Sequence, residues 1–234
     1  MKLEDAILGR RSIRAFRPDP VPAAVLREIV ECSCWSPSAA NTQPWEFTIV
    51  GGEPLQALRS RLRAEAAADP VGKPELRWAP NLPEHIKRRR VEVGDAVFQA
   101  LGIGAADKAR KDAWFLAGIG FFDAPQVILF IMERFFTELA VLDMGAVAVS
   151  VELLAHGKGL GTCPQVAPLR YPWIFHEMLK IPESKRVMLC MPIGYPAQDA
   201  PVNRFPRTRL PVGDVLSWSG ITPQGATVAD KSRG

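Results

Sequence analysis

The stretch PQVILFIM, residues 125–132, is an uninterrupted apolar run. A strand with one wet face would alternate apolar and polar side chains, so this run predicts a central strand that is buried on both faces. WEFTIV (45–50) and RVMLCMPIGY (186–195) predict two further strands. Helical segments separate the three strands, but without the regular alternation of a doubly wound sheet. We therefore expect an α+β fold in which helices pack on a mixed sheet.

Residues 139–156 predict a long helix that is apolar on nearly all sides and ends at GKGLG (157–161). Asp143 and Glu152 interrupt its apolar stretch, which is too short to span a bilayer. A helix without a polar face is buried either in a core or between subunits, and the pattern alone leaves both possibilities open.

The composition limits the class of protein. With 234 residues and 47% hydrophobic content, the chain can form one sizeable core. The start, MKLEDAILGRR, lacks the apolar region of a secretory signal. The four cysteines suggest neither a disulfide framework nor a zinc site. We expect a cytoplasmic protein with no metal and no membrane segment, in which the three histidines serve surface or packing roles.

Arginines concentrate near both ends of the chain. GRRSIRAFRPDP (9–20) contains four of them, and NRFPRTRLP (203–211) contains Arg204, Arg207 and Arg209. A guanidinium stays charged and presents a planar fork that matches phosphate oxygens. Two such clusters, brought together by a folded core, could enclose a phosphate, with Ser12 adding a hydroxyl donor. The alternative is that these arginines are merely solvated surface residues.

Nucleic-acid binding is not expected. The net charge of +4 is mild, and the basic residues do not form a stripe interleaved with aromatic residues.

Two motifs together, RRSIRAFRPDPVP and SPSAANTQPWEFTIV, resemble the start of the FMN-dependent nitroreductase family. HGKGLGTCPQ, LKIPESKRVMLCMPIGYP and VNRFPRTRLPV resemble later parts of that family in the same order. The resemblance implies one nitroreductase-like domain over residues 1–234, with a mainly antiparallel central sheet flanked by helices. It also implies a homodimer with FMN at the interface, in which a C-terminal extension (197–234) embraces the partner. The irregular segment 69–90 is a candidate lid.

The resemblance also implies which residues hold FMN. It places Arg10 and Ser12 at the phosphate, which the C-terminal pair closes, and Arg14 near the N1–C2=O edge of the ring. Arg11, between them, is also among the expected cofactor-binding residues. A loop would contribute to the flavin site of the neighbouring subunit, and a segment after GLGTCP would offer a backbone N–H to flavin N5. The C-terminal pair is Arg207 and Arg209. The loop residues are Pro37, Ser38, Ala39 and Asn41, and the residues of the segment near N5 are Gln165, Val166 and Ala167.

The activity implied by the resemblance is hydride transfer from NAD(P)H to nitroaromatic, quinone or related acceptors by a ping-pong mechanism. Flavin N5 would carry the hydride, so no catalytic side chain is expected. The alternatives are a free-flavin reductase, a specialised reductase or dehalogenase of the same fold, and a non-catalytic flavin-binding protein. The run KRRR (87–90) could meet the 2′-phosphate of NADPH or form a solvated helix face.

One part of the family pattern is missing. Related chains commonly carry an Asn where this chain reads AGIGFF (117–122), and neither Gly118 nor Gly120 can replace an amide side chain. Arg110 or Lys111 is a candidate for the mid-chain positive charge.

Overall fold

The computed structural model describes residues 1–76, 79 and 81–221. Its centre is a four-stranded sheet in the order β1-β2-β4-β3, and each neighbouring pair is antiparallel. The strands are β1 (Glu46–Gly51), β2 (Gln126–Glu133), β3 (Gly161–Thr162) and β4 (Lys185–Gly194). A single parallel bridge joins Ser12 to Thr162 at the β3 edge. The sheet is therefore mainly antiparallel, as expected.

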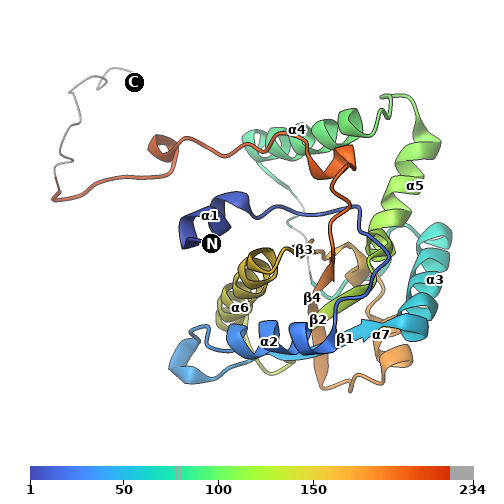
Figure 1. The fold of residues 1–234 in the computed structure, drawn as a ribbon, viewed down its shortest axis with the longest axis horizontal. Coiled ribbons are helices and arrows are strands. Elements are labelled where there is room, and N and C mark those ends of the chain that lie inside the picture. The colour runs from blue at the N-terminus through green and yellow to red at the C-terminus, as the bar shows by residue number, and fades with distance from the viewer. Residues whose placement is uncertain (77–78, 80, 222–234) are drawn as a thin grey trace.

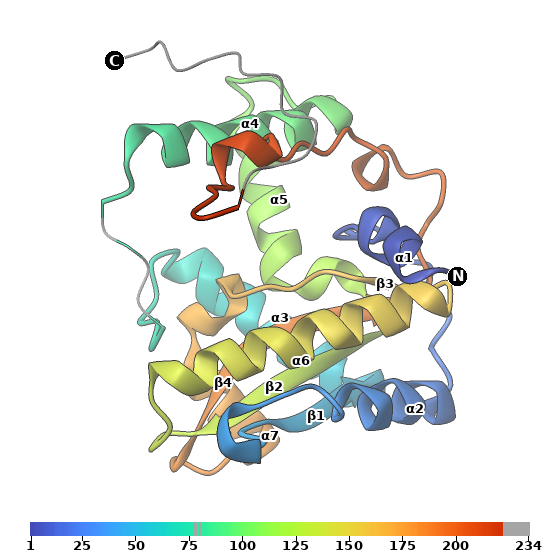
Figure 2. The same ribbon diagram turned by 90° about the vertical axis from the view of Figure 1, so that its left-hand side faces the viewer.

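Seven α-helices surround the sheet within the described residues (Figures 1 and 2). They are α1 (Leu3–Gly9), α2 (Ala23–Ser33), α3 (Gly52–Ala68), α4 (Glu84–Ala100), α5 (Lys108–Ile119), α6 (Glu138–Gly157) and α7 (Pro172–Leu179).

Strand β2 is buried on both faces, which confirms the prediction from its apolar run. Ile128, Phe130 and Met132 point into a core shared with α2 and α6. The alternate side chains, among them Val127 and Leu129, point into a second core shared with α3, α5 and α7. The period of two along a strand thus sends neighbouring residues into two separate layers of helices.

Helix α6 combines the two environments that its sequence allowed. Met144, Val147 and Val151 on one face are buried in the core shared with α2. The other face exposes Leu142 (73%) and Leu139 (70%) to solvent in the single chain. Helix α6 has the length and mean hydropathy of a membrane-spanning helix, but its buried face forms part of the core.

The N-terminal arginine segment packs directly against β3. The Ile13 N–H donates to the Thr162 carbonyl at 2.8 Å. This close approach requires a glycine at position 161, because a Cβ there would lie 2.5 Å from Cγ1 of Ile13. β3 is short and glycine-containing, so the sequence pattern did not reveal it as a strand.

Gly161→Ala is expected to destabilise the protein. The added methyl must displace the buried Ile13 side chain, and overpacking of this kind costs about 1–3 kcal/mol. Thermal unfolding should show a Tm several degrees below that of the wild type. Gly94→Ala, in the middle of α4 with no other heavy atom within 4 Å of the added Cβ, is the control. It should hold or raise Tm, since alanine favours helix. An unchanged Tm for Gly161→Ala would contradict the packing argument.

Candidate functional site

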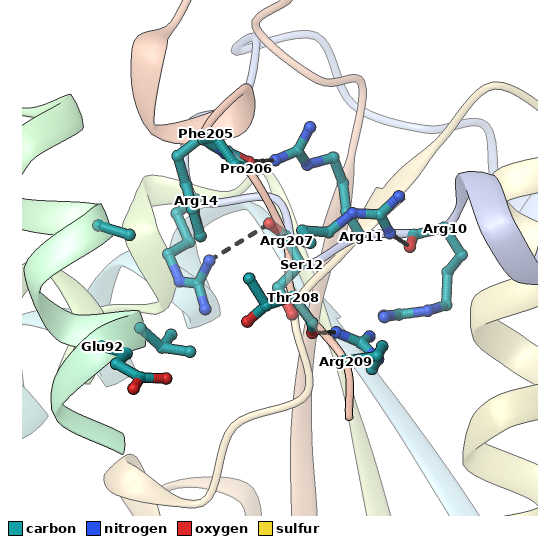
Figure 3. A pocket seen from close by; sticks show the side chains of 12 residues that line it. Arg10, Arg11, Ser12, Arg14, Glu92, Phe205, Pro206, Arg207, Thr208 and Arg209 are labelled. Carbon is teal, nitrogen blue, oxygen red and sulfur yellow. Dashed lines mark hydrogen bonds between the residues drawn. The ribbon is translucent and has the colours of Figure 1, made fainter. Parts of the chain in front are cut away.

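The two arginine clusters line one cavity of about 310 Å³, here called the arginine cavity (Figure 3). The N-terminal segment contributes Arg10, Arg11, Ser12 and Arg14, and the C-terminal segment contributes residues 205–209. Its remaining wall is Glu92, Val93 and Ala96 of α4. The structure therefore brings together all six residues expected at the phosphate and the adjoining ring edge, from opposite ends of the chain.

Not every arginine of the two clusters belongs to the cavity. Arg17 is exposed and pairs with Asp19 at 2.8 Å. Arg204 is exposed and pairs with Asp199 at 2.9 Å. Arg17 and Arg204 are therefore solvated surface residues, as the alternative interpretation of the clusters expected.

Asn203 holds the two ends of the chain together beneath the arginine cavity. It is buried, and its Oδ1 accepts from the Arg14 backbone N–H at 2.8 Å. Its Nδ2 donates to the carbonyls of Ala15 (2.8 Å) and Ala197 (3.0 Å). The side-chain amide thus adds to the backbone bridge between Phe16 and Pro196, and it joins segments that are almost 190 residues apart.

Two further contacts fix the arginine side chains. The Arg207 guanidinium donates to the backbone carbonyls of Arg10 and Leu8. The Phe205 ring lies 5.6 Å from the Arg11 guanidinium carbon and 5.8 Å from that of Arg14. Cation–π contacts of this kind hold the charged groups without neutralising them.

The arginine cavity is strongly electropositive. Burial lowers the pKa of Arg11, and the positive charges of Arg207 and Arg14 lower it further. Five guanidinium groups share the wall with one carboxylate, that of Glu92. A multivalent anion would relieve this repulsion. Guanidinium forks and the Ser12 hydroxyl are the donors that suit phosphate oxygens, so the residues present fit the phosphate of a mononucleotide.

Behind Arg10 lies a carboxylate that sequence reasoning did not connect with the site. Oε1 of Glu152, on α6, accepts from Nη1 of Arg10 at 2.6 Å, and Glu152 is 6% exposed. Burial raises the pKa of Glu152, while Arg10 and the Thr162 hydroxyl oppose that rise. The available signal was an acidic residue in an otherwise apolar helix segment.

The segment predicted to pass flavin N5 continues from the strand that pairs with Ser12. The Gln165 backbone N–H donates to the Cys190 carbonyl at 2.8 Å, and its Nε2 donates to the Gly118 carbonyl at 3.1 Å. Gln165 is thus anchored to β4 and to α5. Within the described part of the chain, no hydrogen bond is found for the N–H groups of Val166 and Ala167. None of the three lines the arginine cavity.

The loop predicted to serve the neighbouring subunit is fastened to α6. The Ala39 N–H lies 3.3 Å from both carboxylate oxygens of Asp143, and Ser36 Oγ lies 2.7 Å from Ser150 Oγ. Ala40 and Asn41 adopt left-handed φ angles of 49° and 57°, a strained backbone that the surrounding structure must maintain.

The loop does not meet the arginine cavity within one chain. Pro37, Ser38, Ala39 and Asn41 are absent from the residues that line that cavity. The loop attaches to α6 at Asp143, whereas Arg10 attaches to α6 at Glu152, about 13 Å further along a helix.

The mid-chain basic residues have local partners. The Arg110 guanidinium donates to the carbonyls of Gly102 (2.8 Å) and Leu101 (2.7 Å), and Lys111 Nζ donates to the Ala105 carbonyl. Both close the connection between α4 and α5, and neither lines the arginine cavity. Arg63 lies against Gly120, where an added Cβ would sit 2.2 Å from the guanidinium Nε.

The basic run 87–90 lies on α4. Lys87 pairs with Glu84 at 3.6 Å and Arg88 with Glu92 at 3.7 Å, as on an ordinary solvated helix face. Arg89 differs, because it lines a second cavity of about 470 Å³ together with Thr208 and Arg209. Of the candidate lid, Trp78 lies outside the described residues.

Comparison with known proteins identifies the family. The family model described as "Nitroreductase family" matches residues 7–195. A 4-nitrobenzoate reductase from Pseudomonas putida is 32% identical over 206 residues, which are 87% of this chain and 90% of the relative.

Solved structures agree with this match. The FMN and NADPH-dependent nitroreductase NfnB from Sphigopyxis sp. strain HMH has a TM-score of 0.91 and 33% identity, covering 94% of this chain and 100% of that one. NfnB from Mycobacterium smegmatis, solved in complex with NADPH, has a TM-score of 0.87 and 27% identity, covering 92% and 97%. The sheet, the arginine cavity and the matches along most of the sequence agree, and the chain belongs to the nitroreductase family.

Proposed function

We propose that this protein is an FMN-dependent oxidoreductase that takes hydride from NAD(P)H and passes electrons to nitroaromatic, quinone or related acceptors in a ping-pong cycle. The observation that carries the proposal is the arginine cavity, which two distant segments build around a space suited to a phosphate. Its nitroreductase relatives include enzymes that depend on FMN and NADPH.

Each group of residues has a role in this proposal. Arg10, Arg11 and Ser12 bind the cofactor phosphate, and Arg207 and Arg209 close on it. Bound FMN supplies the hydride chemistry, because its N5 atom accepts and donates hydride.

The other contacts adjust the reactivity of the ring. Arg14, held against Phe205, places a fixed positive charge where reduction of the ring builds up negative charge. The N–H groups of Val166 and Ala167 are the donors left for N5, because the N–H of Gln165 is already bonded to Cys190. No histidine or cysteine nucleophile is needed.

The preferred nicotinamide is proposed to be NADPH. Arg89 and Arg209 line the second cavity, which shares Glu92, Val93, Thr208 and Arg209 with the arginine cavity. A nucleotide phosphate bound there would lie beside the flavin site. One NfnB relative is NADPH-dependent and the other was solved in complex with NADPH, which supports this assignment.

The active form is proposed to be a homodimer with two composite sites. Leu139, Leu142 and Val149 leave an apolar face of α6 exposed, and the loop 36–41 is fastened to the same helix. Trp35, beside that loop, is 90% exposed. A two-fold interface over α6 would cover these groups and carry the loop of one chain to the flavin of the other.

Two further segments complete the proposal. Residues 211–221 are exposed and run away from the body of the chain, which suits an extension that embraces a partner (Figure 1). Residues 222–234 of that extension lie outside the described residues.

In the candidate lid 69–90, α4 begins at Glu84 and continues past the lid into the cavity wall. We place the enzyme in the cytoplasm, where NAD(P)H is supplied.

Arg209→Ala should weaken FMN binding about ten- to hundredfold, because hydrogen bonds to charged groups contribute about 1.5–3 kcal/mol. The dissociation constant can be measured by flavin fluorescence during dialysis of the holoenzyme. Arg204→Ala is the matched control, since Arg204 is exposed, pairs with Asp199 and does not line the arginine cavity. If both variants retain FMN as the wild type does, the phosphate assignment is wrong.

Leu142→Glu should convert the dimer into a monomer and release FMN, because it places a charge on the apolar face of α6. Light scattering after gel filtration measures the mass, and the absorbance of the same peak reports bound flavin. Val71→Glu changes a side chain that is equally exposed, at 73%, but lies outside α6. A wild-type mass for Leu142→Glu would remove this interface from consideration.

The holoenzyme should lose its yellow flavin absorbance when NADPH is added without oxygen, and should regain it on addition of 4-nitrobenzoate. Steady-state double-reciprocal plots should be parallel, as a ping-pong cycle requires, with NADPH giving a larger kcat/KM than NADH. Flavin that neither nicotinamide reduces would favour the non-catalytic alternative instead.

A further inference from the structure

Among the acidic residues that the structure describes, Glu152 alone is buried. It lies on the core side of α6, and among the described residues its ion-pair partner is Arg10, a residue of the arginine cavity. Burying a carboxylate is costly unless a partner compensates the charge. The position of this carboxylate, directly behind a phosphate-binding guanidinium, therefore calls for a functional reason.

The Arg10 guanidinium stands between Glu152 and the cavity. Nη1 donates to Glu152 at 2.6 Å, while the side chain is turned toward Thr208 and Arg209 (Figure 3). The side chains of Arg10 and Glu152 are 20% and 8% exposed. An anion that binds Arg10 from the cavity must share this guanidinium with the carboxylate, at a place where water screens the two negative charges poorly.

Few other polar or titratable groups lie near Glu152. Arg10 and the Thr162 hydroxyl contact it, and the buried Cys163 thiol is close enough for its pKa to be raised by the Glu152 charge. His156 follows one turn later on α6. Among the residues that the structure describes, Arg10 is thus the positive charge that opposes the rise that burial produces in the pKa of Glu152.

We propose that Glu152 is the counter-ion of Arg10 in the free protein and takes up a proton when the flavin phosphate binds, so that it sets the affinity for FMN and links that affinity to pH. This inference rests on the proposed FMN site and adds an affinity-determining residue to it. The proton comes from solvent and adds to the carboxylate, and no bond of FMN is broken or formed.

The direction of the pH dependence follows from linkage. The approach of a phosphate raises the pKa of Glu152 above its value in the free protein, because like charges disfavour ionisation. FMN affinity therefore rises as pH falls through the interval between the two values. Measurements belong above pH 7, because the phosphate itself gains a proton near about pH 6.

Glu152→Gln keeps the shape and an acceptor for Arg10 but removes the charge. We expect it to bind FMN more tightly than the wild type, by a ratio that grows as pH rises through the interval between the two pKa values of Glu152 and levels off at about tenfold, equivalent to about one pKa unit. Calorimetric titration of the apoprotein with FMN, in two buffers of different ionisation enthalpy, should show proton uptake by the wild type and none by the variant. Glu28→Gln, an exposed residue paired with Lys158, should match the wild type in both respects.

The outcomes separate this inference from the FMN site itself. Wild-type protein that binds FMN above pH 7 without proton uptake would overturn the role of Glu152 and leave the FMN site intact, with no variant needed. Weaker binding by Glu152→Gln would also overturn it, since that result makes Glu152 a residue that only positions Arg10. Failure of the wild type to bind FMN at all would instead refute the proposed function.

Discussion

The hydrogen bonds of one buried side chain, Asn203, connect the two ends of this protein. Its amide accepts from the Arg14 N–H and donates to the Ala15 and Ala197 carbonyls, so the start and the end of the fold are fixed to each other beside β4. A backbone bridge between Phe16 and Pro196, and the bonds from Arg207 to the carbonyls of Arg10 and Leu8, connect the same two segments. The proposed phosphate site depends on both clusters, and these bonds together fix the distance between them.

The arginine cavity places several positive charges close together in partly buried positions. Five guanidinium groups around one cavity repel one another. Burial lowers the pKa of Arg11, and the charges of Arg207 and Arg14 lower it further. The fold tolerates the repulsion through contacts that leave the charges intact, such as the Phe205 ring and the backbone carbonyls that Arg207 contacts. The buried carboxylate of Glu152 compensates only one of the five. A site built in this way favours occupation by a multivalent anion over the empty state.

Much of the fold followed from local sequence patterns. The apolar run of β2 identified the central strand, and helical spacing located α6 to within about two residues, because these patterns report burial directly. β3 was missed because a strand of two residues is too short to show an alternation of apolar and polar side chains. The meeting of the arginine clusters was predicted from composition at the two ends together with family resemblance. The ion pair between Arg10 and Glu152 was not, since a single residue in a helix gives no sign of its distant partner.

The division of α6 into two unlike faces shows where sequence reasoning had to stop. An all-round apolar helix is compatible with a core or with an interface, and the chain uses one face for the core while the other carries exposed leucines. Three polar residues on this helix hold distant segments. Asp143 and Ser150 fasten the loop 36–41, and Glu152 contacts Arg10.

The wide sequence separation of the cavity walls has a consequence for biosynthesis. The N-terminal arginines leave the ribosome early, whereas residues 203–209 emerge only when nearly the whole chain has been made. During translation the first cluster therefore has no second wall with which to hold a nucleotide. The proposed FMN site is therefore completed only with the last part of the chain, and a truncated product that lacks residues 203–209 is expected not to retain flavin.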